Sequence, residues 1–92
     1  MKSLAIKYKD PRKLKPLLRN PRTHTPRQIK QIAASITEFG FINPVLLDAA
    51  DGIVAGHARV AASISLGMTD VPTVRVDHLS PAQIRAYVIA DN

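Results

Sequence analysis

The 92-residue sequence contains no cysteine and no tryptophan, and aromatic residues make up only 4% of it. The absence of cysteine excludes disulfides, thiolate metal sites and a thiol nucleophile, and it is compatible with a reducing cytoplasm. So few aromatic residues argue against a platform on which single-stranded nucleic acid bases stack. The sequence has no apolar run of membrane-spanning length and no secretory signal at its start, so we expect a soluble, cytoplasmic protein.

Positive charge is concentrated at the start of the chain. Residues 1–30 hold ten of the thirteen Lys and Arg and one acid, whereas residues 31–92 carry three bases and six acids. We predict one domain over 1–92, with a basic arm at 1–25 and a core at 26–92. A basic arm suits a polyanion such as the DNA backbone, although it is equally typical of a solvated tail. The candidate nucleic-acid contacts are Lys13, Lys15, Arg19 and Arg27.

The first third of the chain predicts an edge strand and a helix. Apolar and polar residues alternate from Leu4 to Lys9, which is the period of a strand with one wet face. An exposed edge of this kind is able to pair with a second copy, so a homodimer is one possible state. Thr25 and Pro26 form a helix start, apolar residues recur at three- and four-residue steps up to Phe39, and Gly40 ends the helix. Phe39 is expected in the core.

The remaining two thirds alternate between short apolar runs and helical patterns. Two β-branched or aliphatic runs joined by a short loop predict a hairpin. A valine-rich strand carries Pro72 at its beginning or at an edge position of the sheet. Ser80 and Pro81 repeat the cap-and-proline signal of a helix start. The predicted elements are strands at 45–47, 53–55 and 71–76 and helices at 56–66 and 81–92.

The central stretch, residues 51–67, reads as a strand, a glycine turn and a helix. The first amides of a helix lack internal partners and carry partial positive charge, and Gly56 allows a ligand to approach the backbone. Arg59 in the first turn adds a fork that grips phosphate. On spacing alone, however, a plain structural turn with Arg59 in solvent is favoured. Ser63, one turn further on, is expected to face solvent.

Other chemistry-bearing residues are scattered. Asp48, Asp51 and Asp70 fall in predicted loops without an obvious cluster, whereas phosphodiester cleavage commonly needs carboxylates that hold metal ions. The three histidines show no metal-binding spacing, and His24 is expected to be a solvent-exposed loop residue. The residues alone therefore favour binding over catalysis.

Three stretches in unbroken order resemble the amino-terminal domain of the ParB and sulfiredoxin-like superfamily. They are Asn20–Arg22, the run from Ala34 to Val45 that contains Gly-Phe-Ile-Asn-Pro, and Ala55–Arg59. More narrowly, the chain is similar to ParB-like domains at the front of phage and bacterial DNA-modification methyltransferases. The resemblance implies a compact α/β (α+β) fold with a small mixed sheet and about three helices.

The resemblance also implies a ligand. In this superfamily the Gly-x-x-Arg turn binds nucleotide phosphates, so a nucleoside triphosphate, CTP or ATP, with Mg²⁺ is the expected cofactor. The expected nucleotide-binding residues are Gly56, His57, Ala58, Arg59, Arg22 and Asn20. Asp91 and Asn92 match a pair that reaches the magnesium in partition proteins, and oxygen ligands suit that ion. A polar helix end explains this pair equally well.

The turn departs from each branch of the superfamily. Chromosome-partitioning proteins have Gly-Glu-Arg-Arg, so His57 and Ala58 replace two of their residues. Sulfiredoxins need a cysteine here, and His57 removes that nucleophile. A small-molecule kinase branch has Gly-His-His-Arg, which the present turn approaches more closely, but a catalytic carboxylate has no evident counterpart. The chain is therefore not expected to be a sulfiredoxin.

These observations lead to three functional hypotheses. The first is a nucleotide-binding, DNA-associated module. The alternatives are a metal-dependent ParB-like nuclease or nucleoside triphosphate hydrolase, and a structural front domain of a DNA-modifying protein. We expect the chain to be a fragment of a longer protein, with a methyltransferase or DNA-binding domain as the partner that follows, and no membrane partner.

Overall fold

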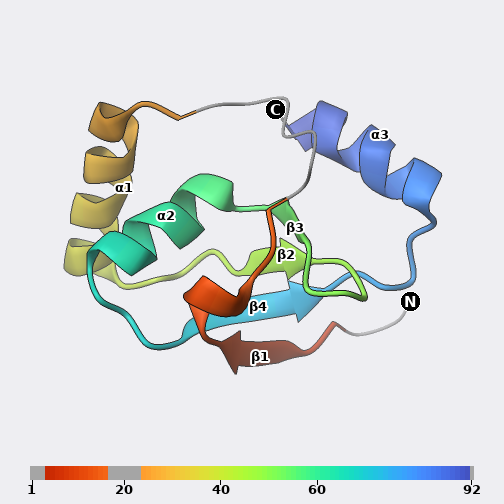
Figure 1. The fold of residues 1–92 in the computed structure, drawn as a ribbon, viewed down its shortest axis with the longest axis horizontal. Helices are drawn as coiled ribbons and strands as arrows, with labels where there is room; N and C mark the ends of the chain where they lie inside the picture. Colours follow the sequence, from red (N-terminus) through yellow and green to blue (C-terminus); the bar gives the residue numbers. More distant parts are fainter. Residues whose placement is uncertain (1–3, 17–23, 92) are drawn as a thin grey trace.

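The computed structural model describes residues 4–16 and 24–91, which form a four-stranded sheet, three α-helices and a short 3₁₀ helix (Figure 1). The predicted α/β fold with a small mixed sheet and three helices is confirmed. In chain order the elements are β1 (Ile6–Lys9), η1 (Pro11–Lys13), α1 (Pro26–Phe39), β2 (Val45–Leu47), β3 (Ile53–Ala55), α2 (His57–Ser65), β4 (Val71–Arg75) and α3 (Pro81–Asp91).

The strands follow the order β1-β4-β2-β3 across the sheet. The predicted hairpin is confirmed, since β2 and β3 pair antiparallel, while β4 runs parallel to β2 and antiparallel to β1. Pro72 is the second residue of β4, opposite Tyr8. Its place near the beginning of the strand is confirmed, but β4 is an inner strand with neighbours on both sides.

Helix α1 begins with the predicted cap. The Thr25 hydroxyl accepts a hydrogen bond from the Gln28 amide (3.1 Å), and the Gln28 side chain accepts one from the Thr25 amide (2.9 Å). Gly40 ends the helix at a φ of 86°. Because α1 packs mainly against α2, only a narrow stripe of it is covered, and Ile36 is buried while Phe39 is 64% exposed. The expectation that Phe39 lies in the core was wrong.

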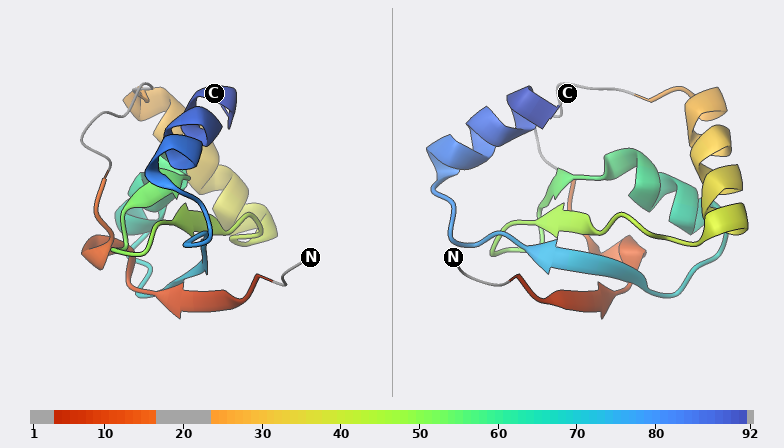
Figure 2. Two further views of the ribbon diagram at one scale, coloured as in Figure 1. Left: turned by 90° about the vertical axis from the view of Figure 1, so that its right-hand side faces the viewer. Right: turned by 180° about the vertical axis from the view of Figure 1, so that it is seen from behind.

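Apolar side chains cover both faces of the sheet, because successive residues of a strand point to opposite sides. On one face, α2 packs against β2 and η1 packs against α2, and Leu14 fixes the N-terminal segment to the core. On the other face α3 lies over β3, as the two views of Figure 2 show. The first cluster is Leu14, Val45, Leu47, Ile53, Val60 and Val71, and the second is Val54, Val74, Val76 and Val88.

The burial of two helical side chains, Tyr87 and Ser63, differs from the prediction. Val88 of α3 is buried as expected, whereas Tyr87 beside it is 38% exposed. Ser63 of α2 is fully buried and donates a hydrogen bond of 2.7 Å to the carbonyl of Val60, so the expectation that it faces solvent was wrong. Within the described ranges, no helix combines the length and apolar character needed to cross a membrane.

Candidate functional site

Gly56 forms the turn between β3 and α2. It is the N-cap of the helix, in the left-handed region at φ 107° and ψ 21°, and it offers no side chain to cap the helix. The first helical hydrogen bond runs from the Val60 amide to the Gly56 carbonyl (2.9 Å), so the amides of His57, Ala58 and Arg59 come before it. The partial positive charge of a nine-residue helix is concentrated at these amides.

There is little free space beside Gly56 for a side chain. A Cβ atom built on Gly56 would lie 3.1 Å from Nη2 of Arg59 and 3.4 Å from the Cα of Val45. A side chain here would therefore be strained in its backbone and would displace the guanidinium. The predicted strand, glycine turn and helix are present, and the glycine also keeps the arginine close to the helix start.

The Arg59 side chain turns back toward the glycine rather than into solvent. Its Nη2 donates a hydrogen bond of 3.3 Å to the Pro44 carbonyl, which lies just before β2. Arg59 is partly buried, so its guanidinium is held beside the N-terminus of α2. A guanidinium has five donors in a planar fork, and the contact to Pro44 fixes the orientation of that plane.

A cavity of about 390 Å³ extends from Arg59 toward α1. Its wall is largely apolar, with Ser35, Asn43 and Arg59 as polar groups. Gly40, which ends α1, and Asn43 both line it. The sequence interpretation missed Ser35 and Ile42, because their roles depend on how α1 and the following loop are placed against α2. The lining residues are Ile32, Ser35, Ile36, Phe39, Gly40, Phe41, Ile42, Asn43 and Arg59.

His57 is the first residue of α2 and is half-buried. Burial lowers the pKa of its imidazole below the usual 6.5, and the charge of nearby His24 lowers it further. His24 lies in a loop as expected, but it is partly buried rather than fully exposed. His24 therefore lies near the first residue of α2, beside the glycine turn.

The lowered pKa of His57 predicts a pH-dependent stability. The unfolded chain binds a proton at the usual pKa of 6.5 while the folded chain binds it only at lower pH, so the free energy of unfolding decreases as pH falls below about 6.5. We expect the urea midpoint to decrease between pH 7.5 and pH 5.5, and the decrease to become smaller in His57→Gln. The exposed His78 provides the control, since His78→Gln is expected to keep the wild-type slope. Equal slopes in all three proteins would contradict the assignment.

Several predicted site residues cannot be placed. Asn20, Arg22 and Arg19 lie outside the described residues, and so does Asn92. Asp91 ends α3, but only its backbone is described. Their assignment to a nucleotide, a magnesium ion or nucleic acid therefore stays a prediction.

The remaining candidate nucleic-acid contacts do not form one patch. Lys13, Lys15 and Arg27 are all exposed, as a polyanion contact requires. Lys13 ends η1 and Lys15 bridges to Gly52, whereas Arg27 lies in the first turn of α1. The start of α1 and η1 lie apart in every view of the fold (Figures 1 and 2). DNA contact by these residues remains a prediction.

Two of the loop carboxylates, Asp48 and Asp51, have structural partners. Asp48 accepts hydrogen bonds from the amides of Ala50 and Gly52, both at 2.8 Å. Asp51 pairs with Lys9 and Arg75, and the hydrogen bond from Lys9 is the main cause that lowers the pKa of its carboxyl group. In the part of the chain that is described, no three His, Asp or Glu side chains lie close enough to hold a metal ion.

Fold and site together define a small α/β domain in which an arginine-bearing glycine turn opens a helix beside a cavity. The profile of the ParB N-terminal domain matches residues 2–92, so it covers nearly the whole sequence. The chain belongs to the ParB N-terminal domain family.

Individual proteins agree with this assignment. The chain is 41% identical over 80 residues to the ParB-like nuclease domain-containing protein YnaK of Escherichia coli K12, covering 87% of this chain and 92% of YnaK. Its fold is similar to that of the C-terminally truncated chromosome-partitioning protein ParB of Caulobacter crescentus, crystallised with CTP-γ-S. That comparison has a TM-score of 0.83 at 24% identity, covering 96% of this chain and 52% of the other.

A second structural relative is a free serine kinase mutant in complex with AMP. The TM-score is 0.69 and the identity 27%, with 87% of this chain and 34% of the kinase chain covered. The chain thus spans about half the length of the Caulobacter chain and a third of the kinase chain. Both likenesses concern the shared domain.

Proposed function

We propose that this domain binds a nucleotide, with the phosphates at the N-terminus of α2 and the base in the adjacent cavity. The observation that carries the proposal is the position of Arg59, which lies beside the Gly56 turn and also lines the cavity of about 390 Å³. One side chain therefore connects the N-terminus of a helix to an open cavity with largely apolar walls. Nucleotides combine the same two chemical parts.

Each part of the site has a distinct role in this proposal. The amides of His57, Ala58 and Arg59 bind phosphate oxygens, and Gly56 allows the phosphate to approach them. Arg59 adds charge-assisted hydrogen bonds while Pro44 holds its plane. Ile32 and the other apolar residues of the cavity wall enclose the base, and Ser35 and Asn43 are the polar groups available to orient it.

The solved relatives give independent support, since the Caulobacter protein was crystallised with CTP-γ-S and the serine kinase with AMP. We take CTP or ATP as the candidate ligand. Magnesium would screen the charge of the phosphates when bound, with Asp91 and Asn92 as the proposed ligands. Contact with a DNA backbone through Lys13, Lys15 and Arg27 is a secondary role that fits their exposure and charge.

The proposal is tested by calorimetric titration of the chain with CTP, ATP and GTP, each with and without magnesium. We expect saturable binding of one nucleotide per chain. Cytidine and adenosine serve as controls, because they keep the base and sugar but lack the phosphates that the α2 terminus would bind. Their affinity is expected to be much lower.

Equal affinity for a nucleotide and its nucleoside would show that the helix terminus does not bind the phosphate. Absence of binding by any of the three nucleotides would also overturn the proposal, and would favour the structural front domain instead. Product formation during the titration, followed by chromatography of the nucleotide, would reveal hydrolysis.

A further inference from the structure

Strand β1 leaves one edge of the sheet open. It lies at the end of the order β1-β4-β2-β3, and within residues 4–16 and 24–91 no strand pairs with its outer side. The backbone groups on that side are a template for another extended chain. The side chains of β1 determine which chain would fit.

One face of β1 carries apolar residues that remain exposed. Ile6 and Tyr8 stand opposite Val74 and Pro72 of β4, and they are 57% and 67% exposed. Val74, by contrast, is only 7% exposed, because α3 and its neighbours cover the inner part of this face. The contacts of α3 are with β3, at the far end of the strand order, so this apolar pair remains uncovered.

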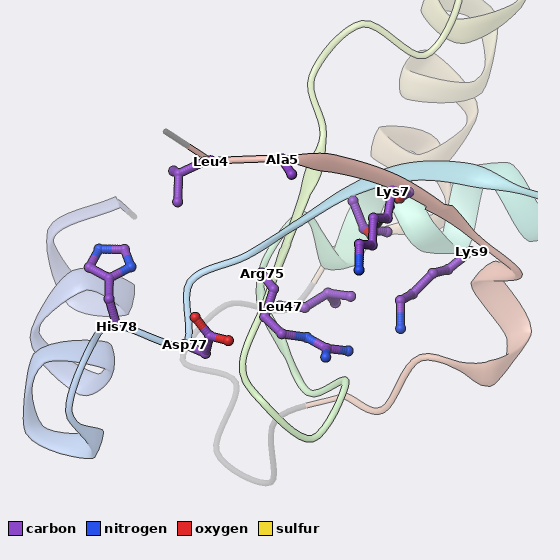
Figure 3. A pocket seen from close by; sticks show the side chains of 9 residues that line it. Leu4, Ala5, Lys7, Lys9, Leu47, Arg75, Asp77 and His78 are labelled. Carbon is purple, nitrogen blue, oxygen red and sulfur yellow. Dashed lines mark hydrogen bonds between the residues drawn. The ribbon is translucent and has the colours of Figure 1, made fainter. Parts of the chain in front are cut away.

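The other face of β1 is basic and borders a hollow of about 270 Å³. Figure 3 shows Lys7, Lys9 and Arg75 extending their charged groups into this common space, with Leu47 behind them. Asp51 pairs with Lys9 and Arg75. Among the described residues Lys7 has no ion pair, and the acid in the lining of the hollow is Asp77.

These charges disfavour pairing of β1 with a second copy of itself. An antiparallel pair of β1 strands would place lysines of one copy against lysines of the other, and like charges on opposed strands are destabilising. Lysine on an edge strand is a common means of preventing such self-association. A strand that places acids opposite the lysines of β1 would instead form attractive cross-strand charge pairs.

We infer that β1 is a docking edge for an extended segment of a partner protein in which apolar and acidic residues alternate. The backbone of the segment pairs with the outer side of β1, its apolar side chains cover Ile6 and Tyr8, and its carboxylates face Lys7 and the hollow. This is strand addition, in which backbone hydrogen bonds provide affinity and alternate side chains provide selectivity. The inference is independent of nucleotide binding.

The test uses two fluorescein-labelled ten-residue peptides, one alternating valine with glutamate and one alternating valine with lysine. We expect fluorescence anisotropy to show binding of the acidic peptide and at least tenfold weaker binding of the basic one. Lys7→Glu is expected to reverse this order, because it turns an attractive cross-strand pair into a repulsive one. The control Lys30→Glu makes the same charge change at an exposed position of α1, and it is expected to keep the wild-type preference.

Hydrogen exchange locates the bound peptide, and the β1 amides that face away from β4 are expected to become protected only when the acidic peptide is present. The exposed Ile6→Thr variant tests the apolar face separately, and it is expected to weaken binding without changing the charge preference. The inference is overturned if neither peptide binds, if both bind equally, or if Lys7→Glu leaves the preference unchanged in a folded protein. Self-association that protects β1 without any peptide would also overturn it.

Discussion

Replacing Arg59 with alanine is expected to weaken nucleotide binding by about ten- to a hundredfold, which corresponds to the loss of hydrogen bonds to a charged group. The reason is its position, since its Nη2 lies 3.3 Å from the Pro44 carbonyl and close above Gly56. The variant removes the guanidinium from the point where helix terminus and cavity meet. Calorimetric titration with the nucleotide that binds best to the wild-type protein measures the effect.

Two further variants make this result interpretable. Arg85 is an exposed arginine of α3, so Arg85→Ala makes the same charge change away from the site and is expected to leave the affinity unchanged. Arg59→Lys keeps the charge but loses the planar fork, so an intermediate affinity is expected. Circular dichroism verifies that each variant folds. Wild-type affinity in a folded Arg59→Ala protein would refute the assignment of the phosphate site.

Leu47→Ala is expected to reduce the free energy of unfolding by about 2 to 5 kcal/mol, the usual range for a buried leucine. Leu47 lies in β2, has no exposed surface, and packs in the cluster that joins β2, β3 and α2. A domain of this size is typically stable by roughly 5 to 14 kcal/mol, so the variant would lose a large part of its stability. Urea denaturation followed by circular dichroism measures the loss.

The matched control for this experiment is Leu66→Ala, which makes the same truncation at a residue that is 42% exposed. It is expected to cost well under half as much, since less apolar surface leaves water at that position on folding. A loss below about 1 kcal/mol for Leu47→Ala would mean that the core around β2 is able to collapse into the space left by the missing leucine side chain.

The features that the sequence predicts well depend on neighbouring residues. Thr25, Pro26 and Gln28 define the start of α1 within four positions, and Ser80 and Pro81 do the same for α3. Gly56 similarly identifies the turn between β3 and α2, because few other residues adopt its backbone conformation. The predicted elements agree with the structure for this reason.

The features that the sequence did not predict depend on distant contacts. The apolar period of α1 places Phe39 on the same stripe as Ile36, but only the packing of α1 on α2 decides that Phe39 stays exposed. Ser63 can be buried because its hydroxyl group keeps a hydrogen bond, which it donates to a carbonyl of its own helix. The cavity beside Arg59 needs α1, the loop after it and α2 together, and local patterns carry no information on that arrangement.

The pairing of β1 with β4 has a consequence for how the chain is made. Lys9 stands opposite Val71, so 62 positions of sequence separate the two strands at their nearest point. During synthesis at about 5 to 20 residues per second, β1 therefore waits roughly 3 to 12 s before its partner strand exists. The β2–β3 hairpin and the contact between α1 and α2 can form before β4 exists, because all of their residues precede β4 in the chain. The first strand of this sheet to be made therefore has no strand to pair with until the last one is made.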